Sequence, residues 1–218
     1  MESNSRQPLS TTYFGPVQWY QRLCQPEQVW IERWESFQKQ TLRNRCLIAS
    51  ANGVQALTVP VEHSAGNCLV KDVRISDHGN WRHLHWNALR SAYGKSPFFD
   101  YYEDDLHPFF ENIHPNRWAY LFDFNEAIRE KMCELLDIQP KVTFSSTYHH
   151  PADISLTSHL LPLTSDYREA INPKHPLPDP DFVPKPYYQV YQQKHGFLSN
   201  LSILDLLFNM GPEGIFYL

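Results

Sequence analysis

Prolines crowd one part of this chain and set the firmest limit on what it can fold into. Proline has a fixed φ and no backbone N–H, so it interrupts both helices and the hydrogen-bond ladders of sheets. We therefore predict an irregular, proline-stiffened loop over about residues 151–186. Its prolines after Pro151 are Pro162, Pro173, Pro176, Pro178, Pro180, Pro184 and Pro186.

The chain as a whole is poor in glycine and rich in aromatic rings. Its 218 residues include only 8 Gly beside 17 Pro, and Phe, Trp and Tyr make up 14%. This balance predicts a bulky core with stiff loops rather than a glycine-rich phosphate-binding fold. None of the HExxH, GxSxG, GxxxxGK[ST] and GxGxxG motifs is present, and the sequence identifies no cofactor.

Length and charge narrow the class of protein further. The length suits a single domain over residues 13–218, after a flexible tail at residues 1–12. The net charge of −5 argues against general nucleic-acid binding, which needs a basic surface. No apolar run of about 18 residues exists, so we predict no transmembrane segment. The N-terminal residues are polar, without the apolar core of a signal peptide, and we expect a cytoplasmic protein.

The spacing of the four cysteines bears on metal binding and redox chemistry. Cys24, Cys46, Cys68 and Cys133 form no CxxC pair, which disfavours a zinc ribbon or a redox pair. We expect four free thiols in a reducing compartment. Arg45 beside Cys46 would favour its thiolate, but the sequence shows no base next to this thiol.

The N-terminal third predicts a short helix and then strands. Pro16 suits the first turn of a helix over residues 15–24. Residues 29–34 and 72–76 are strand candidates. Residues 41–50 and 54–61 give the strongest hairpin signal, because Asn52-Gly53 between them tolerates positive φ.

The remainder is mainly helical in pattern. Helices are predicted over residues 81–93, 98–110, 117–136 and 199–210, with a strand over 141–145. Asp77 or Asn80 is the expected cap of the first of these helices, and Gly94 and Gly211 are expected to end two of them. We predict a single α/β (or α+β) domain, in which a mostly antiparallel N-terminal sheet packs against helices.

Basic residues near the hairpin are the first candidate for chemistry. If residues 41–50 form a strand, Arg43 and Arg45 point to the same face, about 7 Å apart. With Lys39, two guanidinium groups at that spacing suit a diphosphate or a carboxylate. The alternative is a solvated strand face.

Two polar residues on apolar helix faces are further candidates. His85 lies on the stripe with Trp81 and Leu89, where it is either a general base or a core histidine satisfied by a neighbour. His83 lies about 200° away around the helix, so the two cannot share a metal ion, and no metal site is predicted. Asp205, in an apolar helix, needs a partner or a raised pKa. Its structural alternative is a salt bridge or an anchoring hydrogen bond.

Several strings together resemble the WbqC-like family of bacterial proteins. They run in the family's order and cover most of residues 13–211. The strings are residues 13–20 (YFGPVQWY), 39–40 with 43–45 (KQ, RNR), 57–61 (LTVPV), Trp81 with 85–86 (HW), 92–93 (AY), 96–99 (SPFF) and 201–211 (LSILDLLFNMG).

The resemblance implies a biological context for the protein and a group of candidate functional residues. Relatives occur in gene clusters for O-antigen and other surface polysaccharides, which implies modification of an activated amino sugar. Longer relatives have a Gly-rich stretch where this chain has residues 151–186, and the compact form looks similar to Bacteroidetes-type versions. The positions that coincide with the family's polar pattern are Asn44, Arg45, His85, Tyr93, Asp205 and Asn209.

These lines lead to a working hypothesis about function. We expect a transferase, of N-acyl or aminoacyl type, acting on a nucleotide-activated sugar. Lys39, Arg43 and Arg45 would hold phosphate, and His85 would be the base with Asp205 orienting it. Trp86 and Tyr93 would stack on the ligand, with Asn44 and Asn209 as further binding residues.

Two alternatives remain open, and the oligomeric state is not predicted. A non-catalytic interaction protein would use the ring-rich residues 97–110 and the proline-rich loop as a partner surface. A cysteine hydrolase would use Cys46 or Cys24.

Overall fold

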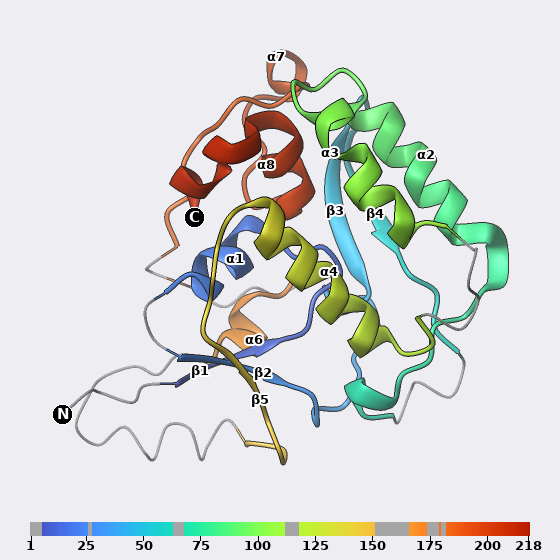
Figure 1. Cartoon of the computed structure of the whole chain (residues 1–218), viewed down its shortest axis with the longest axis vertical. Helices are drawn as coiled ribbons and strands as arrows, with labels where there is room; N and C mark the ends of the chain where they lie inside the picture. Colours follow the sequence, from blue (N-terminus) through green and yellow to red (C-terminus); the bar gives the residue numbers. More distant parts are fainter. Residues whose placement is uncertain are drawn as a thin grey trace.

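The fold combines two small sheets with helices around one apolar core. The computed structural model describes residues 6–25, 28–62, 68–111, 118–150, 166–173, 179 and 182–218. Helices α2 (Trp81–Tyr93) and α3 (Phe99–Leu106) lie on one side of a hairpin, and α1 (Val17–Leu23) and α8 (Ile203–Met210) on the other (Figure 1). The second sheet lies at the opposite end of the molecule from α7 (Gln192–His195).

That second sheet is parallel throughout. Its strands β1 (Arg6–Ser10), β2 (Gln28–Glu32) and β5 (Val142–Phe144) run in the order β1-β2-β5, with Leu9 opposite Ile31 and Ile31 opposite Phe144. Parallel strands need a crossover, and α1 supplies the one between β1 and β2. The predicted flexible tail is therefore wrong over residues 6–12, and the antiparallel prediction holds only for the hairpin.

The hairpin is where the sequence pattern predicted it. Strands β3 (Arg45–Ser50) and β4 (Gly53–Thr58) pair antiparallel, and Gly53 adopts φ +103°, which the turn requires. Both strands are shorter than expected, and Arg43 lies before β3. The strand predicted over residues 72–76 is instead a 3₁₀ turn, η2 (Val70–Asp72), followed by isolated bridges at Arg74 and Ile75.

The helix predictions are largely confirmed. Helix α2 has the predicted bounds, after the 3₁₀ turn η3 (His78–Asn80), and α3 continues into η4 (His107–Phe109). Helix α4 (Leu121–Leu135) begins later than predicted, and Arg117 lies outside the described residues. Helix α8 begins at Ile203, because the Ser202 side chain accepts a hydrogen bond from the Leu204 N–H (3.3 Å), and η5 (Gly211–Tyr217) follows. Among the described residues, no helix is long and apolar enough to cross a membrane.

The proline-rich segment is only partly irregular. Residues 166–173, 179 and 182–186 of it are described, and they include a short helix, α6 (Tyr167–Ala170). Asp166 caps this helix by accepting a hydrogen bond from the Arg168 N–H (3.0 Å), and α6 packs against β1. The other predicted loop residues lie outside the described part of the chain.

The ring-rich residues 97–110 belong to the core. Five of them are no more than 7% exposed, and Trp86 on α2 packs against two of their rings. Only Tyr101 among their large side chains is well exposed, at 73%. The partner surface expected here therefore has no basis in the described structure. The five buried residues are Phe99, Tyr102, Leu106, Phe109 and Phe110.

Gly211 is a position where only glycine fits. It has φ +56°, and a Cβ there would lie 2.6 Å from the Phe98 ring. We predict that Gly211→Ala lowers the free energy of unfolding by about 3 kcal/mol, from backbone strain plus overpacking. Gly196→Ala is the control, because φ is +70° but open space surrounds the new Cβ, and about 1 kcal/mol is expected. Urea unfolding measures both, and equal losses would contradict the packing argument.

Candidate functional site

The basic residues near the hairpin do not form a phosphate site together. Arg43 is buried and donates to both carboxylate oxygens of Glu35 (2.8 and 2.5 Å) and to Ser10 Oγ (2.9 Å). Arg45 Nε donates to Thr58 Oγ1 (2.9 Å). Since β3 begins only at Arg45, the alternation that would align the two guanidinium groups does not reach Arg43. Lys39 is exposed.

The two asparagines support the backbone. Asn44 Nδ2 donates to the Val59 carbonyl (2.8 Å) and thereby closes the base of the hairpin. Asn209 Nδ2 donates to the Asp205 carbonyl one turn earlier in α8 (2.7 Å). Both side chains are buried, so neither is presented to a ligand.

His85 has the surroundings of a core histidine. It is 6% exposed, its Nδ1 lies 2.9 Å from the Tyr13 hydroxyl, and its ring packs edge-on against Trp81. Burial lowers the pKa of His85 from its usual 6.5 to about 4, opposed by a hydrogen bond with the Thr58 backbone. Trp86 is also buried and therefore not available for stacking on a ligand.

Asp205 anchors three parts of the chain. Its Oδ1 accepts from the Tyr93 hydroxyl (2.9 Å), and its Oδ2 accepts from the Tyr187 hydroxyl (2.7 Å) and Gln189 Nε2 (2.8 Å). The residue is fully buried, and burial raises the pKa of its carboxyl despite these three hydrogen bonds. The contacts join α8, α2 and the segment before α7, which is the anchoring role that the sequence left open.

His85 and Asp205 belong to separate clusters. Tyr93, the Asp205 partner, lies eight residues beyond His85 on α2, or roughly 12 Å along the helix axis. No described contact joins the histidine to the aspartate. The hypothesis that Asp205 orients His85 therefore finds no support in the geometry.

The cysteines do not form a nucleophilic site. All four are free thiols, and Cys46 is buried. Burial raises the pKa of the Cys46 thiol well above its usual value and that of Cys24 to about 12. A thiolate is the nucleophile, so both thiols are unsuited to attack. No group of three potential metal ligands lies together in the described part of the chain.

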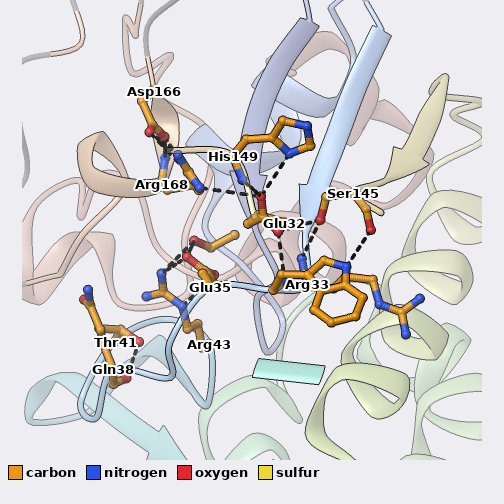
Figure 2. Close-up of polar contacts among 12 residues, drawn as sticks. Glu32, Arg33, Glu35, Gln38, Thr41, Arg43, Ser145, His149, Asp166 and Arg168 are labelled. Atoms are coloured by element: carbon orange, nitrogen blue, oxygen red, sulfur yellow. Dashed lines mark hydrogen bonds and ion pairs between the residues drawn. The ribbon is translucent and has the colours of Figure 1, made fainter. Parts of the chain in front are cut away.

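The parallel sheet brings a different group of polar residues together (Figure 2). Ser10 ends β1, Glu32 ends β2 and Ser145 follows β5 directly. Carboxyl ends of parallel strands meet at one edge of a sheet, and ligands of α/β proteins commonly bind outside that edge. Glu35 and Arg43 lie beside this edge because Ser10 Oγ contacts both of them.

Glu32 is the most heavily bonded residue of the group. One carboxylate oxygen, Oε1, accepts from the Trp34 N–H (2.9 Å) and Ser145 Oγ (2.5 Å). The other, Oε2, accepts from the His149 N–H (3.2 Å) and lies 3.7 Å from Arg168 Nη1. Glu32 is 0% exposed, so these partners replace water around a buried carboxylate.

A cavity of about 200 Å³, named here the edge pocket, opens next to this group. Arg168 forms part of its wall and is held by the Asp166 carboxylate at 2.6 to 3.1 Å. The lining combines two aromatic rings, three carboxylates, one guanidinium and smaller polar groups. These residues are Trp34, Glu35, Ser36, Gln38, Tyr148, Asp166, Arg168 and Glu169.

Sequence reasoning missed this site. The acidic residues Glu32 and Glu35, at and near the end of an apolar strand, were a usable signal, because a charge at a strand end either faces solvent or is held in a site. The two acidic residues alone do not reveal that β1, β2 and β5 pair in parallel. This pairing brings Ser10 and Ser145 to Glu32 from distant parts of the chain. Arg168 comes from the segment predicted as irregular.

The buried His85 should make folding pH-dependent. Its pKa of about 4 lies below the usual 6.5 of an unfolded chain, so the unfolded state binds more protons between these values. The stabilisation is present above about pH 6.5 and is lost as pH falls toward 4, by up to about 3 kcal/mol. In His85→Gln we expect the free energy of unfolding to change less steeply with pH. The slope should correspond to nearly one proton fewer taken up on unfolding.

Urea unfolding at a series of pH values from 4.5 to 7.5 measures this slope. His83→Gln is the matched control, because His83 is exposed on the same helix. An unchanged slope in His85→Gln would contradict a neutral, buried histidine.

Comparisons with known proteins agree with the sequence strings. Residues 10–174 match the WbqC-like protein family. The uncharacterized protein Rv1507c of Mycobacterium tuberculosis (strain ATCC 25618 / H37Rv) is 28% identical over 198 residues, which are 84% of this chain and 83% of that protein. No solved structure matches significantly. The family match spans well over half of the chain and includes every residue lining the edge pocket, so this protein belongs to the WbqC-like family.

Proposed function

We propose that this protein is a transferase, of N-acyl or aminoacyl type, that modifies a nucleotide-activated amino sugar for bacterial surface polysaccharide, and that the sugar binds in the edge pocket. Membership of the WbqC-like family supports the biological setting. The proposal moves the substrate site from His85 and Asp205, which are buried and fully bonded, to the open carboxyl edge of the parallel sheet.

The observation that carries the proposal is the mixture of rings and carboxylates around one pocket. Carboxylate oxygens accept hydrogen bonds from sugar hydroxyls and pair with an ammonium group. The exposed ring of Tyr148 offers a flat apolar face against which the C–H groups of a sugar can pack. Arg43 pairs with Glu35 and Arg168 with Asp166, so the exposed Glu169 gives the wall its net negative charge, which favours a cationic amino group over a phosphate.

The size of the pocket fits one part of such a substrate. Its volume of about 200 Å³ is below the roughly 300–1,000 Å³ of pockets that enclose drug-sized ligands. A single sugar ring would therefore enter while the nucleotide stays outside. Lys39, exposed and next to the lining residue Gln38, is the basic residue we propose for the diphosphate.

Tyr148→Ala tests the pocket as the sugar site. We expect uridine diphosphate glucosamine to raise the melting temperature of the wild type by several degrees, since a ligand at 100 times its Kd stabilises by about 2.7 kcal/mol. Removing the ring should weaken the Kd about fivefold to tenfold, because ring packing contributes about 1 kcal/mol. Titration calorimetry of both proteins measures the change.

Tyr188→Ala is the matched control. Tyr188 is similarly exposed, at 52% against 48% for Tyr148, but does not line the edge pocket. Its Kd should equal that of the wild type. Equal weakening in both variants, or no thermal response of the folded wild type to any nucleotide amino sugar, would contradict the proposal.

A further inference from the structure

A histidine faces the buried Glu32 carboxylate at the sheet edge. His149 Nδ1 lies 3.5 Å from Glu32 Oε2, and the His149 backbone N–H donates to the same oxygen (3.2 Å). The backbone hydrogen bond holds the main chain of His149 beside Glu32, so the imidazole ring lies against the carboxylate (Figure 2). At this distance Nδ1 forms no hydrogen bond with Glu32 in this structure, and catalytic hydrogen bonds are often long or poorly aligned before a substrate binds.

The carboxylate itself cannot turn away easily. Ser145 Oγ and the Trp34 N–H hold its other oxygen, at 2.5 and 2.9 Å. Arg168 Nη1 lies 3.7 Å from the oxygen that faces the histidine and supplies a balancing positive charge. Glu32 is therefore an oriented acceptor for a proton on Nδ1.

The far edge of the imidazole is the part that a substrate can reach. Nδ1 is buried, yet the His149 side chain is 35% exposed, so its exposed atoms lie elsewhere on the ring. Figure 2 shows the second ring nitrogen turned away from Glu32. The Trp30 ring lies against the imidazole at 4.2 Å between centroids, tilted by 32°, and restricts its rotation.

The pair adjoins the edge pocket. Tyr148, the residue before His149, lines the pocket, and so does Arg168, which contacts the same Glu32 oxygen. A buried carboxylate that faces one imidazole nitrogen, while the second nitrogen is turned away from it, is the arrangement in which a histidine can act as a general base.

We propose that His149 is the catalytic base of this protein, that Glu32 is its positioning residue, and that the proton it accepts comes from the amine of the sugar. This inference rests on the proposed function. The acyl donor is taken to be a thioester, which is the co-reactant class that an N-acyl transfer needs.

The bound ammonium group first releases one proton to solvent. The neutral amine then attacks the thioester carbonyl carbon, a C–N bond forms, and an N–H proton passes to His149 Nε2. The C–S bond breaks, the thiolate leaves with its electron pair, and it takes the proton from Nε2. The products are an amide and a thiol, and His149 returns to its starting form with the Nδ1 proton facing Glu32.

The first arm of the test needs no substrate. Nitrogen-15 histidine spectra at pH 9, where free imidazole is neutral, should show His149 with its proton on Nδ1. That preference should be lost in Glu32→Gln, and His150 is the exposed neighbouring control. A proton on Nε2 in the wild type overturns the proposal whatever the substrate is.

The second arm follows thiol release from acetyl coenzyme A in the presence of uridine diphosphate glucosamine. We expect His149→Gln to lower kcat at least 100-fold while the calorimetric Kd for the sugar nucleotide stays within twofold. His150→Gln should keep the wild-type kcat. Retained turnover in a folded His149→Gln overturns the proposal. A wild type that neither binds nor turns over these substrates refutes the proposed function instead. In that case the histidine spectra alone test whether Glu32 positions His149.

Discussion

The structure depends on two carboxylates buried at the end of strand β2 and just beyond it. A buried charge destabilises a protein unless other groups replace its water, and both Glu32 and Glu35 find their partners in distant segments. Glu35 is satisfied by Arg43 and Ser10, which ties the entrance of the hairpin to the parallel sheet. Glu32 is satisfied by the residues after β5 and by Arg168 from the proline-rich segment. The same two residues fasten three parts of the chain, and Glu35 also lines the edge pocket.

A second set of buried polar groups has a different role. Asp205 and Tyr93 are hydrogen-bonded to each other, Asn209 Nδ2 donates to the Asp205 carbonyl, and His85 with Tyr13 is enclosed by rings. Apart from Tyr13, these residues coincide with polar positions of the WbqC-like pattern, but burial leaves them no face toward a ligand. A family's polar positions therefore include anchors of the fold as well as groups that touch substrate.

Local signals in the sequence predicted the local structure well. The Asn52-Gly53 pair specified the hairpin turn, and the apolar stripe ending at Tyr93 specified α2 to the residue. Strand β1 was missed because Arg6–Ser10 has no alternating apolar pattern and is a strand only through pairing with β2.

The site was missed for the same physical reason. Which residues share the carboxyl edge of a parallel sheet depends on strand order, and strand order is set by contacts between segments over a hundred residues apart. Arg43 and Arg45 were wrongly paired because β3 begins at Arg45, four residues later than predicted, so the alternation of faces does not extend to Arg43.

All of the proposed roles depend on ligand binding at the carboxyl edge of the parallel sheet. A titration of the wild type with uridine diphosphate glucosamine, followed in backbone amide spectra, tests this binding site. We expect shifts that saturate together and cluster in residues 33–39, 145–149 and 166–169. Shifts clustered instead around His85 and Asp205, with the sheet edge unchanged, would contradict it.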